Sequence, residues 1–166
     1  MLTRLSVQLV IKAAIKANKN PLPAQSKGGL YLVLTSDDIQ VQDLCDVPGL
    51  RAYPFAVPDY ARGAVKPLKS PNGEVGVDAM ISVIAHEMAE MATDPLVNVW
   101  YASSDAADPV EIADLCIGKY GGGDGSGYVG EVRRDAHGAV FNVYGIRRRF
   151  LIQWICSYVA DDCVGP

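Results

Sequence analysis

The sequence lacks several patterns that identify common classes of protein. None of its four cysteines forms a Cys-x-x-Cys pair, which excludes a zinc ribbon and a thioredoxin-type motif. No run reaches the roughly 18 apolar residues of a membrane span. There is no Gly-x-Ser-x-Gly nucleophile elbow, and the glycine-rich stretch at 118–127 fits neither phosphate-binding fingerprint. We therefore expect a globular protein without a membrane span and a flexible loop at 118–127.

A basic face is also missing. The net charge is −4 and the isoelectric point is about 5.1. One basic cluster, Arg147-Arg148-Arg149, lies between apolar, strand-like residues, and this position predicts a solvated strand end or turn. A protein that binds nucleic acid needs a concentrated positive surface, so we predict no nucleic-acid partner.

The first residues do not resemble a secretory signal peptide. Lys12 and Lys16 interrupt the apolar run, and no small-residue cleavage site follows. The spacing of the apolar residues predicts an amphipathic helix that ends near 18–20, because Pro21 follows. Glycines then open an apolar, branched run at 28–41, which predicts a buried strand.

The clearest predicted element is a helix over 76–93. It follows a proline-rich, irregular connection at 46–73, and Pro95 stops it. Asp78 is expected to act as its N-terminal cap or as a first-turn carboxylate. The helix is apolar nearly all round, which is typical of a buried helix. Its polar stripe must then meet partners inside the protein; the stripe consists of Ser82, His86, Glu90 and Thr93.

The remaining segments predict an α+β fold. Residues 108–116 read as a short helical turn, and the alternating pattern from 128 to 159 predicts two or three antiparallel strands. His137 falls in the turn of a hairpin. We expect a mixed or antiparallel sheet packed on the 76–93 helix, which would be a buried helix of the active-site type, in a zincin-like arrangement.

Chemistry concentrates in the motif His-Glu-x-x-Glu. On a helix, His86 and Glu90 are one turn apart on the same face, so both can reach one ion. Glu87 is rotated by about 100° and could approach a metal-bound water from the side. Catalytic zinc takes three protein ligands and keeps a water position open. This pattern predicts zinc held by His86 and Glu90, with Glu87 as the catalytic base.

The third metal ligand must come from another segment. Glu111 and Asp114 are the candidates, because an E-x-x-D turn places both carboxylates on one side. One of them could bind the metal while the other orients His86. The alternative interpretations, both without any metal, are a hydrogen-bonded core pair of His86 and Glu90 or a solvated polar stripe.

Several segments together resemble the EXORDIUM family, also called phosphate-induced proteins. They read GGLYLVLTSDDIQVQDLC, AYPFAVPDYARGAVKPLKSPNGEVGVDAMISVIA, TDPLVN, GYVGEV and FNVYGIRRRFLIQW. The resemblance implies an extracellular or cell-wall protein linked to growth and cell expansion, acting on a peptide or a cell-wall component. The chain is similar to family members with an HExxE…TDP…EIxDxC pattern, which resemble zinc metallopeptidases. The rival expectation is a non-catalytic wall or signalling protein with a relic site.

The resemblance also implies an organisation and a disulfide. We expect a single EXORDIUM-like domain over 1–166, truncated at its N-terminus and shortened after residue 45, where the family has a cysteine-rich segment. Cys116 and Cys163 match family positions, so they are the expected disulfide pair. Cys156 has no counterpart in the family pattern.

Overall fold

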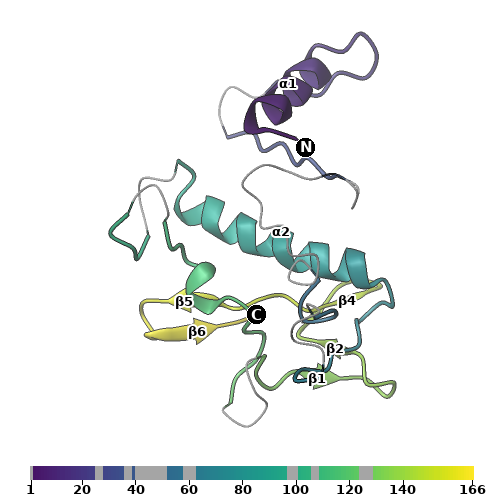
Figure 1. Cartoon of the computed structure of the whole chain (residues 1–166), viewed down its shortest axis with the longest axis vertical. Helices are drawn as coiled ribbons and strands as arrows, with labels where there is room; N and C mark the ends of the chain where they lie inside the picture. The colour runs from purple at the N-terminus through teal and green to yellow at the C-terminus, as the bar shows by residue number, and fades with distance from the viewer. Residues whose placement is uncertain are drawn as a thin grey trace. The chain divides into compact units, whose positions relative to one another are not determined.

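The chain folds as two compact units, Met1–Asp46 and Val47–Pro166, in the computed structural model (Figure 1). The structure describes residues 2–24, 28–35, 39, 52–57, 63–96, 101–105, 109–123 and 129–166. Among these described residues, no helix is both long and apolar enough to cross a membrane.

The first unit contains the predicted N-terminal helix, α1 (Arg4–Ile15). Thr3 begins it with a capping box, in which the Ser6 backbone N–H donates to Thr3 Oγ1 and the Thr3 backbone N–H donates to Ser6 Oγ. The helix ends at Ile15, earlier than predicted. The carbonyl of Ala14 accepts from the backbone N–H of Leu22 at 3.0 Å, so the chain has already turned back there.

The strand predicted for 28–41 is wrong in its described part. Residues 28–35 form no strand, and the side chains of Leu30, Leu32 and Leu34 are 54%, 58% and 58% exposed. A strand needs a neighbouring strand to take up its backbone N–H and C=O groups. No described segment supplies such a neighbour. Apart from residue 39, the rest of this range lies outside the described residues.

The second unit is built on α2 (Val75–Thr93), which confirms the predicted helix almost to the residue. Its N-cap is Glu74, so Asp78 is a first-turn carboxylate and not the cap. Asp78 is buried and accepts from the backbone N–H of Asn72 at 2.9 Å and from Asn72 Nδ2 at 2.6 Å. The helix ends at Asp94, immediately before Pro95.

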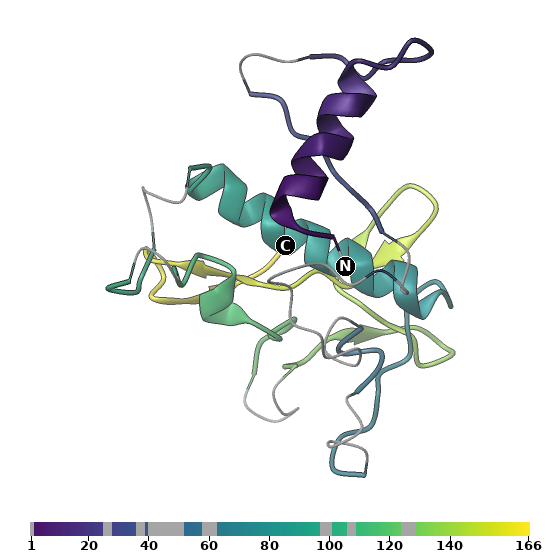
Figure 2. The same cartoon turned by 45° about the horizontal axis from the view of Figure 1, so that its top comes forward.

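Burial of α2 differs from the prediction. The helix lies along one side of the strands in two views (Figures 1 and 2), and only that side is buried. Met88, which was expected to be covered, is 52% exposed. Part of the polar stripe faces inward, as predicted: Ser82 and Glu90 are buried, and Ser82 Oγ lies 3.5 Å from the hydroxyl of Tyr120.

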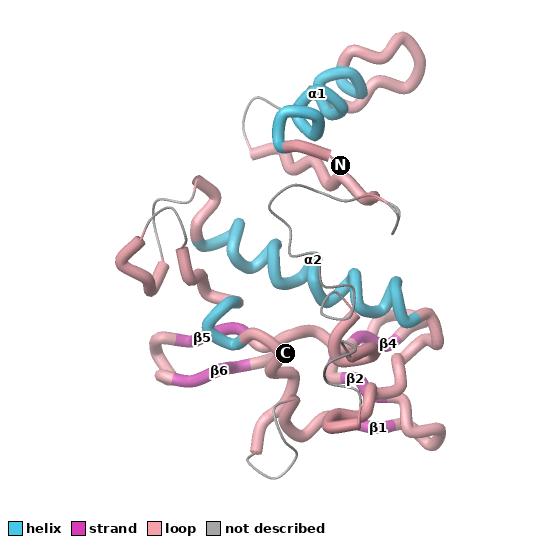
Figure 3. The backbone as a smooth tube through the Cα atoms, viewed as in Figure 1, coloured by secondary structure: helices cyan, strands magenta, loops and turns pink. Residues whose placement is uncertain are grey.

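The C-terminal part is antiparallel, as predicted, but it forms three small sheets and not one (Figure 3). Each sheet is a pair of short neighbouring strands. The pairs are β1 (Arg133–Arg134) with β2 (Val140–Phe141), β3 (Val143–Tyr144) with β4 (Arg149–Phe150), and β5 (Ile155–Ser157) with β6 (Asp162–Val164). The helical turn predicted for 108–116 is a 3₁₀ turn, η2 (Asp114–Cys116). The α+β class is therefore confirmed.

A small core holds α2 and the strand region together. Its buried side chains are Phe55, Ala79, Tyr120, Val140 and Leu151. They come from the segment before α2, from α2 itself, from the residues after η2 and from the strand region. Burial of these side chains fixes α2 against the strand region, while the segment before η2 is held to β5 by the Cys156 backbone N–H, which donates to the carbonyl of Ile112 at 2.9 Å.

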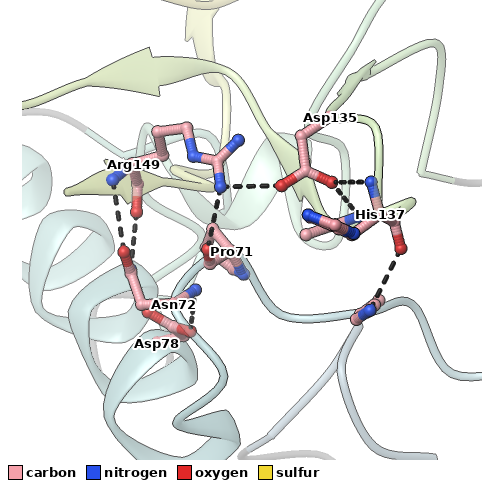
Figure 4. A network of polar contacts seen from close by, with 8 residues as sticks. Pro71, Asn72, Asp78, Asp135, His137 and Arg149 are labelled. Atoms are coloured by element: carbon pink, nitrogen blue, oxygen red, sulfur yellow. Dashed lines mark hydrogen bonds and ion pairs between the residues drawn. The ribbon is translucent and has the colours of Figure 1, made fainter.

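A polar network joins the N-terminus of α2 to the strands (Figure 4). Asn72 Nδ2 donates to the carbonyl of Arg149 at 2.7 Å, and the Arg149 guanidinium donates to Asp135 Oδ2 at 2.7 Å. Arg147 and Arg148 are exposed and Arg149 begins β4, so the predicted strand end or turn is confirmed, although the side chain of Arg149 is half-buried. His137 lies in the predicted turn, where its backbone N–H donates to Asp135 Oδ1.

Asp135 should make stability depend on pH in the acid range. Hydrogen bonds, first from the backbone of Ala139 and then from Arg149, lower the pKa of Asp135 from 3.8 to about 2. A lowered pKa stabilises the fold only while the carboxylate is ionised. This contribution is complete above the unfolded-state pKa of 3.8 and is lost as the pH falls toward about 2.

Urea unfolding across that range checks this prediction. Asp135→Asn should remove this part of the pH dependence, and Asp161→Asn, which changes an exposed turn residue, should leave it. An Asp135→Asn profile parallel to that of the wild type would contradict the assignment.

Candidate metal centre

Helix α2 brings three potential ligands together. One ligand atom each from His86, Glu87 and Glu90 lies within 4.8 Å of the others. His86 Nε2 is 3.0 Å from Glu90 Oε1, as the one-turn spacing predicts. Glu90 is buried, His86 is half-buried and Glu87 is exposed. The helix therefore presents a nitrogen and an oxygen inward and a second carboxylate at the protein surface.

The 3₁₀ turn η2 supplies a further carboxylate from another segment. Asp114 Oδ1 lies 3.3 Å from His86 Nε2. The backbone N–H of Glu111 donates to Asp114 Oδ2 at 3.1 Å and so holds this carboxylate in place. Neither Glu111 nor Asp114 belongs to the three-residue group of the described residues that lies within 4.8 Å, but Asp114 has this contact with His86 and no such contact is found for the side chain of Glu111 in the described part of the chain. Of the two predicted candidates, Asp114 is thus the one that meets His86.

Glu90 does not meet His86 as an ordinary hydrogen-bond acceptor. Glu90 Oε1 is within hydrogen-bond distance, yet it is buried without a well-aligned hydrogen bond from any described residue. The axis of Nε2 is therefore not aimed at this oxygen. An orphaned buried carboxylate oxygen is costly and calls for a partner such as a cation.

The separations also fit a shared ion. Two ligand atoms at about 2.0–2.1 Å from a tetrahedral zinc stand about 3.4 Å apart. The separations of Glu90 Oε1 and Asp114 Oδ1 from His86 Nε2, 3.0 and 3.3 Å, are close to that value. One imidazole with two carboxylates is a donor set that zinc accepts.

The electrostatics of the group favour a positive charge. Burial alone would lower the pKa of His86, but the contact with Glu90 and the charges of Glu90, Asp114 and Glu87 outweigh it, so the pKa is raised. Burial, followed by the charge of Glu90, raises the pKa of Glu87. Burial and the same neighbouring carboxylates raise the pKa of Glu111. A proton or a metal ion would relieve this accumulation of negative charge.

Sequence reasoning did not identify Gln153, which completes the surroundings of His86. Its Nε2 lies 3.1 Å from His86 Nδ1 and donates to the carbonyl of Ala113 at 2.8 Å, while its Oε1 accepts from the backbone N–H of Gly118 at 3.2 Å. A signal was present: Gln153 is the one polar residue in the apolar run from 150 to 156. A buried amide in such a run must have partners inside the protein.

The disulfide lies next to this centre. Cys116, the last residue of η2, is bonded to Cys163 of β6 with a Cα–Cα distance of 5.8 Å, which confirms the expected pair. Cys156 is a free thiol, and Cys45 lies outside the described residues. The disulfide thus ties the turn that carries Asp114 to the terminal sheet.

Comparisons with known proteins agree with the resemblance seen in the sequence. The family described as the phosphate-induced protein 1 conserved region matches residues 46–166. Protein EXORDIUM-like 3 of Arabidopsis thaliana is 52% identical over 99% of this chain and 57% of its own length. Protein EXORDIUM-like 5 of the same plant is 43% identical over 99% of this chain and 53% of its own length. Protein PHOSPHATE-INDUCED 1 of Nicotiana tabacum is 38% identical, over 69% and 37%.

Two facts limit which properties of these relatives can be assigned to this chain. The chain spans little more than half the length of the two Arabidopsis relatives. No solved structure matches the chain, so a zincin-like arrangement stays a prediction. The match over 46–166 nevertheless covers the whole candidate centre, and the chain belongs to the phosphate-induced protein family, together with the EXORDIUM-like proteins.

Proposed function

We propose that this protein binds one divalent metal ion, zinc first among the candidates, through His86, Glu90 and Asp114. Glu87 is then the general base that takes a proton from water during hydrolysis of a peptide or related acyl bond. The setting proposed for this activity is the extracellular space or cell wall, in keeping with a family role in growth and cell expansion.

One observation carries the proposal. Carboxylates from two separate segments, α2 and η2, converge on the same ring nitrogen, Nε2 of His86, at 3.0 and 3.3 Å. The buried oxygen of Glu90 has no aligned hydrogen bond in the described part of the chain. A relic of an ion pair would gain by aligning that bond, whereas ligands of a shared ion point at a third position.

Each residue of the centre has its own role in this proposal. His86, Glu90 and Asp114 would hold the ion, and the Glu111 backbone N–H orients Asp114. A bound zinc ion would supply Lewis acidity and lower the pKa of its water. Glu87 is exposed next to the group, and its raised pKa brings this carboxylate closer to the range in which it can accept and return a proton near neutral pH.

Glu87→Gln tests the catalytic part of the proposal. The amide keeps the shape of the side chain but cannot act as a base, so zinc binding should persist while hydrolysis falls by about 10²–10⁴-fold. A peptide library digested by the zinc-loaded protein and read by mass spectrometry supplies the activity. Glu74→Gln, an exposed glutamate at the start of the same helix, is the matched control. Cleavage that survives in Glu87→Gln would exclude this role.

A non-catalytic binding or signalling protein is the second candidate. The observation that favours it is the contact between Gln153 and His86 Nδ1, which is what a hydrogen-bonded relic would also show. Under this alternative, zinc does not bind and Glu87→Gln alters stability only. Zinc binding therefore separates the two candidates before any substrate is known.

A further inference from the structure

We propose that Gln153 is a positioning residue that places the proton of neutral His86 on Nε2 in the metal-free protein and so restrains metal binding there. The statement about the proton depends only on the hydrogen bonds around Gln153. The statement about metal rests on the proposed function.

The orientation of the Gln153 amide is fixed by the backbone. Its oxygen accepts from the N–H of Gly118 at 3.2 Å, and its nitrogen donates to the carbonyl of Ala113 at 2.8 Å. Turning the amide by half a rotation would set oxygen against a carbonyl and NH₂ against an N–H. Gln153 is 7% exposed, so water cannot readily replace the lost bonds. The NH₂ group must therefore face Ala113.

This orientation determines what His86 presents to Gln153. The second hydrogen of the NH₂ group has two acceptors in reach, the carbonyl of Trp154 at 3.4 Å and His86 Nδ1 at 3.1 Å, and Nδ1 is the nearer of the two. Nδ1 can accept it only through its lone pair, and in a neutral imidazole the proton then belongs to Nε2. A proton on Nε2 is favoured by the negative charge of Glu90 and Asp114, whose oxygens are 3.0 and 3.3 Å from Nε2, although no aligned hydrogen bond to Glu90 Oε1 forms. Both sides of the ring favour the same tautomer.

A metal ion at Nε2 requires the other tautomer. The ring must then carry its proton on Nδ1, where histidine ligands usually donate to an oxygen. In this structure Nδ1 faces a donor, so Gln153 would have to turn and give up its bonds to Gly118 and Ala113. Metal binding is thus opposed by the bonds that hold Gln153 in place.

The proton position can be measured directly. The chain has two histidines, so His137→Asn leaves His86 as the sole imidazole. Long-range ¹H–¹⁵N correlation spectra of this metal-free, full-length variant, recorded at a pH where the ring is neutral, should show the proton on Nε2. Adding Gln153→Met removes the donor and should shift the population toward Nδ1. A proton on Nδ1 with Gln153 present would overturn the proposal.

Zinc affinity tests the restraint. Gln153→Glu offers an acceptor to Nδ1 and should tighten zinc binding by about 10–100-fold, the range typical of groups that orient a ligand. Gln8→Glu adds the same charge on α1 and controls for simple attraction. A carboxylate at 153 also attracts a cation in its own right, so a second variant without added charge is needed. Gln153→Met removes the donor to Nδ1 and should also tighten zinc binding.

The outcomes are distinguishable. Equal zinc affinity in the wild type and both Gln153 variants would overturn the proposal that Gln153 opposes metal binding. If no variant binds zinc while the proton is on Nε2, the metal site fails and the tautomer assignment stands.

Discussion

Removing the Cys116–Cys163 disulfide should lower the free energy of unfolding by about 4 kcal/mol, the chain-entropy value for a loop of this size. The bond joins residues 47 positions apart. It is expected to act mainly on the unfolded chain, which without it explores many more conformations. It also anchors η2, so the variant should bind zinc more weakly because Asp114 is held less firmly.

The design must prevent a substitute bond. Cys156 stands directly opposite Cys163 in the register of β5 and β6, so it could pair with Cys163 if Cys116 alone were changed. The double variant Cys116→Ser/Cys163→Ser removes both partners. Cys156→Ser, which keeps the disulfide, is the control. Urea unfolding that differs by less than about 1 kcal/mol between double variant and control would contradict the prediction.

The double variant His86→Ala/Glu90→Ala should lose zinc binding. Changes outside the ligand shell already cost about 10–100-fold in metal affinity, so loss of two ligands should cost well over about 100-fold. Titration followed by calorimetry measures this directly. His137→Ala removes the other histidine, which is exposed in a turn, and should change nothing. Equal loss in both variants would show that the zinc was bound nonspecifically.

Local patterns predicted the parts of the site that one helix supplies. Helical spacing alone places His86 and Glu90 together, and Pro95 marks the end of α2. The E-x-x-D pattern could not choose between Glu111 and Asp114. The choice depends on a backbone hydrogen bond from Glu111 to Asp114 and on the packing of η2, which no local pattern reveals.

The failures have a common physical origin in partners far away in the sequence. The run at 28–41 has the composition of a buried strand, but its described residues have no neighbouring strand. Gln153 approaches His86 across 67 positions of sequence. The apolar residues all round α2 predict a buried helix, although packing on one side is enough to hold a helix. Each outcome depends on which segments meet, not on what each segment prefers.

Metal content of the wild-type protein tests the central claim most directly. The protein would be purified without chelators, analysed for zinc and other divalent metals, and compared with the His86→Ala/Glu90→Ala variant. We expect close to one zinc ion per chain in the wild type and none in the variant. A wild-type protein that holds no metal and takes up none when zinc is added would contradict the account.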